Sequence, residues 1–442
     1  MSKLKLHDYQ KRTVEYLHTQ PNAILSVGLG LGKTISTLYY INEIKPKTVL
    51  IIAPKRVAEH VWKQEAKKWG LDDVYRKMVI VCGTPSQRKE KLNNDAKPYK
   101  IIGRDNLSDL KNWSCDILVL DELTSFKSMT AKRSKAVHAI KRKQTIGLTG
   151  TFLANGAIDI YGQAKAVGLY NGAGQNFYAW RATYFKNVMQ GSRQAWEKWV
   201  LRVPLDEVLK PIQKNIFTLT SEDYLDIPEV EYIKHDIELK KDEFKEYMRL
   251  STMLQINLDG VIHSVKEQAK FAKLQTACLG FIYDTKTGEA FRGKHSTKID
   301  AVVELVERAV SEGESVLLAY GFKEEAIWIG EKLKKKGITF CSPNDKKFLE
   351  KFESKEVMVL IGHPSSIGHG INLQNAARIC VWSSITYNYE LWAQMNARLA
   401  RQGQLKAVKI HVFSSKDTIE QNQFNAVMKK DKEQNNFLEI TK

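Results

Sequence analysis

Short apolar runs alternate with amphipathic segments in both halves of the chain, and this repeated alternation restricts the fold more than any other feature. The runs have the length of buried strands, and the segments between them space their apolar residues as helices do. In the first half the runs lie at 22–27, 48–54, 78–83, 100–103, 116–121 and 144–150. In the second half they lie at 315–321, 357–362, 377–382 and 408–415. The pattern predicts an α/β fold with two doubly wound parallel sheets.

The length of the chain also favours two domains, because 442 residues exceed what one hydrophobic core usually holds. Pro228 interrupts any helix near the middle of the sequence, so we place the boundary there. The N-terminal domain is expected at 1–222, with a helical protrusion at about 155–220 where aromatic and basic residues mix. The C-terminal domain is expected at 223–442, with a helical insertion at about 240–290.

The chain is strongly basic, with 68 Lys and Arg against 50 Asp and Glu and a net charge of +18. Such a surplus favours a polyanionic partner, nucleic acid before a membrane surface. The alternative is a solvated surface that is merely rich in lysine.

The five cysteines are scattered and form no C-x-x-C pair, so neither a zinc ribbon nor a disulfide framework is indicated. The first residues lack the apolar core of a signal peptide. No apolar run approaches the roughly 18 residues that a membrane helix needs. These features fit a reducing cytosol, so we expect a cytoplasmic protein.

The stretch GLGLGKT at 28–34 is the strongest local signal, because it follows an apolar strand and precedes a helix. Glycines in such a loop let the backbone approach phosphate, and the helix N-terminus directs amide groups at the anion. Val27 stands where a strict Walker A motif has its first glycine, and a chance Gly-rich turn is the alternative. Lys33 would neutralise the terminal phosphates, and Thr34 would coordinate Mg²⁺. The expected ATP-binding residues are Gly30, Leu31, Gly32, Lys33 and Thr34.

The stretch DILVLDELTSF at 116–126 supplies a pair of carboxylates at the carboxyl end of a strand. Asp121 would hold Mg²⁺ through water, and Glu122 would orient and deprotonate the attacking water. An ordinary acidic loop after a strand is the alternative, which the phosphate loop in the same domain makes much weaker.

Three further polar residues of the first half are candidates for the site. Gln10, just ahead of the first strand, could present its amide to an adenine edge, although a surface helix would also place a glutamine there. Thr149 and Thr151, in the stretch LTGT, could link the Asp121 site to nucleic acid or to the second domain. Taken alone, LTGT is only a turn at the end of a strand.

The second half offers AQMNARLARQGQ at 393–404, where Arg398 and Arg401 stand three apart and would share one face of a helix. We expect them to reach the γ-phosphate, where charge develops in the transition state. Gln394 would lie on the same side. For an isolated pair of helix arginines, solvation is the favoured alternative. The nearby glycines Gly368 and Gly370 suit close approach of the backbone to a phosphate or to the other domain.

Taken together and in order, these stretches resemble the motifs of helicase superfamily two, specifically its Swi/Snf-type branch. The resemblance covers most of the chain. LHDYQ looks like the adenine-reading motif, GLGKT like motif I, DELT like the DEAH box and LTGT like motif III. The stretch VLIIAPKRVAEHVWKQEAKKW looks like motif Ia with the tryptophan that often follows it. GHGINLQ resembles motif V, including Asn372, and QMNARLARQGQ resembles motif VI.

The resemblance implies two RecA-like domains with ATP and Mg²⁺ in the cleft between them, and helical insertions on both. It implies an ATP-dependent helicase or duplex translocase, a nucleic-acid-dependent ATPase that acts on DNA, duplex or forked, before RNA. The residues that match coupling or nucleic-acid contacts are Thr149, Thr151, Asn372 and Gln394. The compact chain is similar to prokaryotic or phage-encoded members, which points to replication or repair in a host cytoplasm.

This sequence departs from the pattern of the branch at several places. Leu123 and Thr124 replace Ala and His of the DEAH box, and Phe152 stands where the branch has proline after LTGT. The stretch IIGRDNL at 101–107 lacks the Thr-Tyr of motif Ib, and LLAYGF at 317–322 is a loose motif IV. These departures bear on how hydrolysis is coupled to nucleic acid.

Other functional classes compete with the motor. One is a nucleic-acid-binding scaffold with a weak or regulatory ATPase site, which the presence of Lys33, Glu122 and Arg401 disfavours. Another is an RNA helicase, and a third is a simple P-loop kinase, which leaves the second α/β unit unexplained. Stimulation of ATP hydrolysis by DNA or RNA separates these alternatives.

Overall fold

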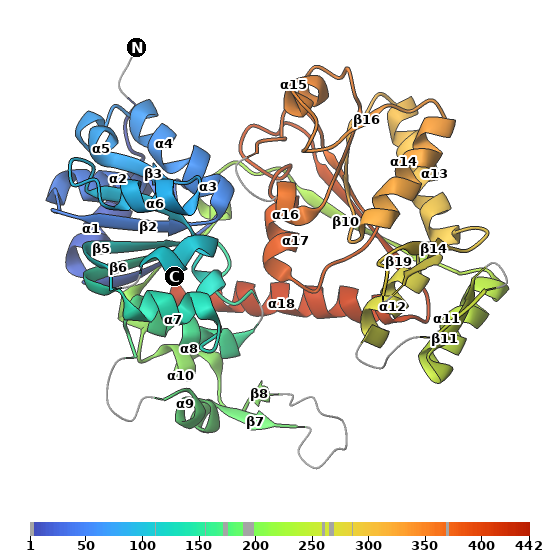
Figure 1. The fold of residues 1–442 in the computed structure, drawn as a ribbon, viewed down its shortest axis with the longest axis horizontal. Coiled ribbons are helices and arrows are strands. Elements are labelled where there is room, and N and C mark those ends of the chain that lie inside the picture. Colours follow the sequence, from blue (N-terminus) through green and yellow to red (C-terminus); the bar gives the residue numbers. More distant parts are fainter. Residues whose placement is uncertain are drawn as a thin grey trace. The chain divides into compact units, whose positions relative to one another are not determined.

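The computed structural model describes residues 4–110, 112–154, 156–170, 176–188, 199–258, 261–264, 269–284, 286–367 and 371–442. The chain forms two compact units (Figure 1), the first from residues 1–225 with 430–442 and the second from residues 226–429. The sequence predicted 1–222 and 223–442 instead. The difference lies mainly at the C-terminus, because Phe437 and its apolar neighbours join the core of the first unit.

The first unit contains a seven-stranded sheet of order β3-β4-β2-β5-β6-β1-β9, in which every pairing is parallel. The central strands β2 and β5 contain runs of buried aliphatic residues, as parallel strands covered on both faces require. The strands are β1 (Asn22–Val27), β2 (Val49–Ala53), β3 (Met78–Val81), β4 (Tyr99–Gly103), β5 (Ser114–Asp121), β6 (Lys141–Thr149) and β9 (Ile216–Leu219). The six predicted strands of the first half are thereby confirmed.

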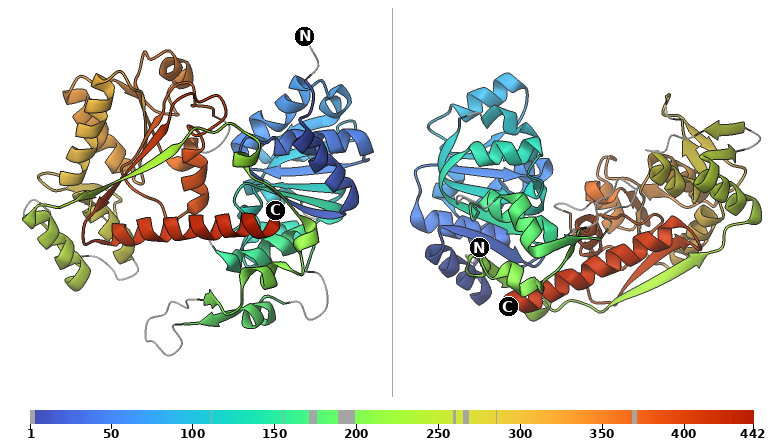
Figure 2. Two further views of the ribbon diagram at one scale, coloured as in Figure 1. Left: turned by 180° about the vertical axis from the view of Figure 1, so that it is seen from behind. Right: turned by 90° about the horizontal axis from the view of Figure 1, so that it is seen from below.

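Helices flank this sheet (Figure 2) and connect its parallel strands. The α-helices up to β6 are α1 (Asp8–Thr19), α2 (Lys33–Ile44), α3 (Lys55–His60), α4 (Trp62–Lys68), α5 (Asp72–Lys77), α6 (Pro85–Leu92) and α7 (Lys132–Ala139). Two 3-10 helices, η1 (Arg104–Leu110) and η2 (Leu123–Phe126), follow β4 and β5 directly.

The predicted helical protrusion at 155–220 is only partly helical. Its helices are η3 (Ala157–Asp159), α8 (Ile160–Val167), α9 (Phe177–Tyr184), α10 (Leu205–Leu209) and η4 (Gln213–Asn215). A short antiparallel pair, β7 (Phe185–Asn187) and β8 (Trp199–Leu201), lies within it. Strand β9 then pairs with β1 at the sheet edge, from Ile24–Ile216 to Val27–Leu219, and η5 (Ser221–Asp223) follows it.

The second unit contains a six-stranded sheet of order β10-β19-β18-β15-β17-β16, again parallel at every pairing. Its strands are β10 (Val230–Ile237), β15 (Val316–Ala319), β16 (Phe340–Cys341), β17 (Val359–Gly362), β18 (Ile379–Trp382) and β19 (Val408–Ser415). The four predicted strands are present, and the expectation of two doubly wound parallel sheets is confirmed. Strands β10 and β16 were not predicted.

The α-helices of the second unit run from α11 to α18, and the last of them extends into the first unit. These helices are α11 (Lys241–Met253), α12 (Lys270–Ala277), α13 (Thr297–Ser311), α14 (Lys323–Lys335), α15 (Phe348–Glu353), α16 (Pro364–Ile367), α17 (Tyr389–Asn396) and α18 (Ile419–Thr441). Helix α18 begins in the second unit and ends in the first. The predicted helical insertion at 240–290 holds α11 and α12, but also the hairpin strands β11 (Gln255–Leu258), β12 (Val261–Ser264), β13 (Phe281–Tyr283) and β14 (Ala290–Arg292).

Within the described ranges, no helix has both the length and the apolar character needed to cross a lipid bilayer.

Candidate functional site

The predicted site residues of the first unit gather at the carboxyl edge of its sheet. Strands β1, β5 and β6 are adjacent and parallel, so the loops that follow them emerge together. The register places Ser26 beside Thr149 and Leu148 beside Asp121. The topology therefore brings the phosphate loop, the DELT stretch and the LTGT stretch to one place, although they are far apart in the sequence.

The phosphate loop has the backbone that its glycines predict. Gly30 has φ of 89° and Gly32 has φ of 79°, in the left-handed region that favours glycine. Helix α2 starts at Lys33, and the first turn of a helix leaves amide groups without intrahelical acceptors. Gly28 was not predicted, yet a Cβ there would lie 2.3 Å from Ser221 Oγ, which donates to the Leu29 carbonyl at 2.9 Å. The loop is thus built for an anion.

Lys33 lies along its own loop and beside the LTGT stretch. Its Nζ donates to the Val27 carbonyl at 2.7 Å and to the Gly28 carbonyl at 3.3 Å. A Cβ at Gly150 would lie 3.8 Å from the same Nζ. Thr34 is half-buried in the first turn of α2. The ammonium group thus lies against the backbone of the phosphate loop, and its contact with terminal phosphates stays a prediction.

Gln10 touches the phosphate loop from helix α1. Its amide Nε2 donates to the Leu31 carbonyl at 3.4 Å, and its Oε1 accepts from the His7 backbone at 2.9 Å. A Cβ at Gly32 would lie 2.4 Å from Gln10 Nε2, so this contact depends on the glycine. Gln10 is buried, and its predicted reading of adenine stays a prediction.

Asp121 is buried at the end of β5 and is held by an indole. Trp62 Nε1 on α4 donates to Asp121 Oδ2 at 2.8 Å, and the Glu122 amide donates to Oδ1 at 3.1 Å. Burial raises the pKa of Asp121, while the Trp62 hydrogen bond and the charge of Lys33 oppose that rise. The sequence pointed only to a tryptophan in the helix after motif Ia, a place that both Trp62 and Trp69 occupy, and the structure shows that Trp62 is the one that donates to Asp121.

Glu122 has a left-handed backbone, with φ of 57° and ψ of 68°. For a residue with a Cβ this conformation is strained, and such strain gathers at functional sites. The next two residues, Leu123 and Thr124, which replace the Ala and His of DEAH, are both buried. A Cβ at Gly147 would lie 2.8 Å from Leu123 Cδ2, so this side chain fills space against β6.

The LTGT stretch forms a tight turn held from several sides. Thr149 is fully buried, and its Oγ1 accepts from the Thr151 amide at 3.0 Å. The Phe152 carbonyl accepts from Gln163 Nε2 at 2.7 Å. The two threonines therefore shape the turn beside Lys33, and their link to nucleic acid stays a prediction.

In the second unit, the prediction that both arginines lie on a helix is wrong. Helix α17 ends at Asn396, and Arg398 and Arg401 follow in turns. Arg398 is buried and its Nη1 donates to the Ile371 carbonyl at 3.0 Å, while Arg401 Nη1 donates to Asn372 Oδ1 at 2.5 Å. Both therefore reach the stretch that resembles motif V. Burial lowers the pKa of Arg401.

Two glutamines frame this turn in different ways. Gln394 is buried on α17 and donates to Glu390 Oε1 at 3.4 Å. Gln404, which had no predicted role, donates to the Gln374 carbonyl at 2.7 Å and the Ala377 carbonyl at 2.9 Å. It fastens the motif VI turn to the motif V stretch. Gly368 and Gly370, predicted to approach phosphate, lie outside the described residues.

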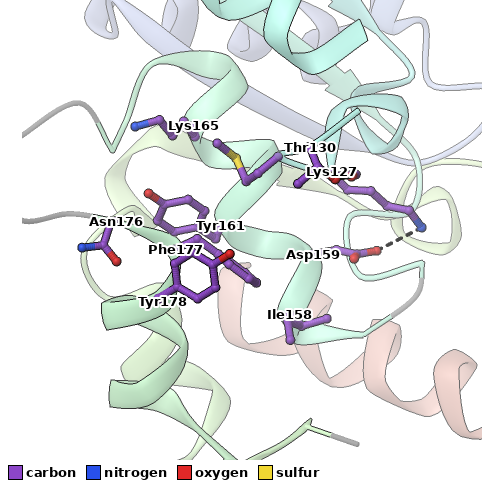
Figure 3. Close-up of a pocket in the computed structure, with 11 residues that line it drawn as sticks. Lys127, Thr130, Ile158, Asp159, Tyr161, Lys165, Asn176, Phe177 and Tyr178 are labelled. Atoms are coloured by element: carbon purple, nitrogen blue, oxygen red, sulfur yellow. Dashed lines mark hydrogen bonds and ion pairs between the residues drawn. The ribbon is translucent and has the colours of Figure 1, made fainter. Parts of the chain in front are cut away.

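A cavity of about 720 Å³ lies in the first unit, beside the segment that follows η2 (Figure 3). Three aromatic side chains line one side of it, Tyr161 from α8 and Phe177 and Tyr178 from the start of α9, and polar side chains such as Lys165 and Asn176 share the lining. Lys127 at its margin pairs with Asp159 at 3.2 Å. No residue predicted for the site lines this cavity.

In the described part of the chain, no three His, Cys, Asp or Glu side chains are grouped as a protein-only metal site. Mg²⁺ is usually held by one or two carboxylates together with substrate phosphates. Asp121 and the Thr34 hydroxyl at the phosphate loop are the residues that fit it.

Comparison with known families gives a match over residues 9–286 to the family described as SNF2-related domain. The match confirms the resemblance to the Swi/Snf branch. Protein p41 of Acyrthosiphon pisum secondary endosymbiont phage 1 is 27% identical over 93% of both chains. An uncharacterized ATP-dependent helicase of Mycoplasma genitalium is 25% identical over 96% of this chain but 42% of its own length.

Among solved structures, the Sulfolobus solfataricus SWI2/SNF2 ATPase core in complex with dsDNA aligns with 99% of this chain and 95% of that chain. The sequence identity is 21% and the TM-score is 0.45.

Proposed function

Because this chain belongs to the SNF2-related family, we propose that it is an ATP-dependent motor on DNA, a nucleic-acid-dependent ATPase. The observation that carries the proposal is the meeting of Lys33 and Asp121 at one edge of the first sheet. A cationic loop at a helix N-terminus beside a buried carboxylate is suited to a nucleotide triphosphate with its metal. A scaffold without catalysis does not require this pairing.

The residues of the first unit take the following roles in the proposal. The backbone from Gly30 to Gly32 holds the phosphates, and Lys33 exchanges its contacts with two carbonyls for contacts with the terminal phosphates. Mg²⁺, when bound, neutralises charge on the phosphates. Thr34 and Asp121 would hold it, and Glu122 is proposed to orient and deprotonate the attacking water.

Arg398 and Arg401 supply positive charge to the γ-phosphate in the proposed mechanism. Arg398 donates to the Ile371 carbonyl and Arg401 donates to the side-chain oxygen of Asn372. Both guanidinium groups are therefore already ordered, and nucleotide binding costs little further side-chain entropy. The same contacts connect the arginines to the stretch that resembles motif V. Gly370, Asn372 and Gln394 are proposed to carry contacts with nucleotide or nucleic acid.

The proposed partner is DNA, duplex or forked, and an RNA helicase is the alternative. The net charge of +18 supports a polyanionic track, whose binding should weaken steeply with salt. The likeness to a phage protein over nearly the full length of both chains supports a phage-encoded motor that works in a host cytoplasm, in replication or repair.

The test is ATP hydrolysis measured without nucleic acid and with duplex DNA, single-stranded DNA or RNA. Duplex DNA should stimulate turnover, and Lys33→Ala should abolish it. Stimulation by RNA alone would favour the RNA helicase. No stimulation by any polymer would overturn the motor.

A further inference from the structure

Helix α18 is shared between the two units. It has 23 residues, from Ile419 to Thr441, and the unit boundary falls within it between Lys429 and Lys430. Figures 1 and 2 draw it as one unbroken helix. A hydrogen-bonded helix is stiff over this length, with a rise of about 1.5 Å per residue. One hydrogen-bonded backbone therefore joins the contacts at the start of α18 to those at its end.

In the first unit, α18 contacts the residues that follow the LTGT turn. Phe437 is fully buried, and its ring centroid lies 5.2 Å from that of Phe152. Gln434 is also buried, and its Oε1 accepts from the Leu153 amide at 2.8 Å. Phe152 is the residue that replaces the proline of the branch. The departure at this position thus coincides with an aromatic partner on the C-terminal helix.

The start of α18 is anchored as firmly in the second unit. Glu420 is buried and accepts from Lys298 Nζ at 2.6 Å and from the Ser415 amide at 2.8 Å. The Ile419 amide donates to the hydroxyl of Tyr247 at 2.9 Å. A buried ion pair with these extra hydrogen bonds allows little sliding of the helix against β19 and α13.

The turn between these contacts and the phosphate loop is rigid. Thr149 and Gln163 hold Thr151 and Phe152 by hydrogen bonds, and Gly150 lies beside Lys33. A displacement of Leu153 should therefore also displace Gly150, which lies beside Lys33.

We propose that Gln434 and Phe437 are positioning residues that couple the second unit to the LTGT turn through α18. This inference rests on the proposed function. In it, movement of the second unit shifts the last turns of α18, which shift Phe152 and Leu153 and reset the turn beside Lys33. Hydrolysis and movement along DNA are thereby tied together.

The first test interrupts the helix without touching its contacts. Lys432 is exposed and lies between the unit boundary and Gln434. Lys432→Pro removes a backbone donor and clashes with the carbonyl one turn earlier, whereas Lys432→Ala keeps the helix. Duplex-stimulated ATP hydrolysis and displacement of a triplex strand are measured side by side. Displacement per ATP should fall about tenfold in Lys432→Pro, with hydrolysis changed by less than about threefold.

The second test compares two buried amides on α18. Gln434→Leu leaves the Leu153 amide without its acceptor, while Gln423→Leu removes an amide that donates to the Ile385 carbonyl in the second unit at 3.4 Å. Displacement per ATP should fall in Gln434→Leu and stay normal in Gln423→Leu.

An unchanged ratio in Lys432→Pro, or equal effects of the two glutamine variants, would overturn the coupling. Absence of DNA stimulation in the unmodified chain would overturn the proposed function itself, so the two failures are distinguishable.

Discussion

Replacement of Trp62 by phenylalanine should weaken the proposed Mg²⁺ site at Asp121 while leaving the phosphate loop intact. The change keeps an aromatic ring but removes the only side-chain donor described for Asp121, whose bond is 2.8 Å long and fully buried. A hydrogen bond to a charged group is worth about 1.5–3 kcal/mol. Loss of a residue that hydrogen-bonds to a metal ligand typically lowers metal affinity by about 10–100-fold. We expect the Mg²⁺ requirement of ATP hydrolysis to rise by that factor.

The pH dependence of the same variant provides a second readout. Burial already raises the pKa of Asp121, and the Trp62 hydrogen bond opposes that rise. Without the indole the pKa should rise further, and only the ionised carboxylate holds Mg²⁺. The acidic limb of the activity profile should therefore move to higher pH. Because the pKa of Asp121 is raised in the folded protein, the free energy of unfolding should fall as pH rises through that pKa, where a buried carboxyl group becomes charged.

The matched control is Trp69→Phe. Trp69 Nε1 donates to Glu65 Oε2 at 3.0 Å, so this variant also removes an indole bond to a carboxylate, away from Asp121. The assay is a Mg²⁺ titration of duplex-stimulated hydrolysis at several pH values. If Trp62→Phe matched Trp69→Phe in both Mg²⁺ requirement and acidic limb, the role given to the indole would be refuted.

Other substitutions test separate parts of the molecule. Gly32→Ala should lower the free energy of unfolding by about 1–2 kcal/mol, because φ is 79° and Gln10 fills the space; an unchanged melting temperature would contradict this. Arg401→Ala should retain nucleotide binding but slow hydrolysis about a thousandfold, and normal turnover would refute its role. Lys298→Met leaves Glu420 buried without its cation and should cost about 3–5 kcal/mol in urea denaturation. A loss below about 1 kcal/mol would mean that the pair contributes little.

The sequence alone predicted those elements that are determined by a few consecutive residues. Strand β5 contains an apolar run, and Gly30 and Gly32 have positive φ angles that favour glycine. The family match also bears out the recognition made from the motifs. These features are visible because each is decided within a few consecutive residues.

Features that depend on distant partners were not predictable. Strand β9 has four residues and is stabilised by its pairing with β1. The role of Trp62 depends on a contact with Asp121, 59 residues away. The helix predicted through Arg398 ends earlier, because Arg398 turns to bond the Ile371 carbonyl. In each case tertiary contacts override the local pattern.

The assignment of 430–442 to the first unit has a consequence for synthesis of the chain. Phe437, Leu438 and Ile440 belong to the hydrophobic core of a unit whose other residues end at 225. Domains generally fold in order as they leave the ribosome. The first unit must wait with an incomplete core, its aromatic surface around Phe152 uncovered, until residues 430–442 emerge. A nascent chain arrested before α18 should therefore hold its N-terminal unit in a loosened, chaperone-binding state that tightens only once α18 has been made.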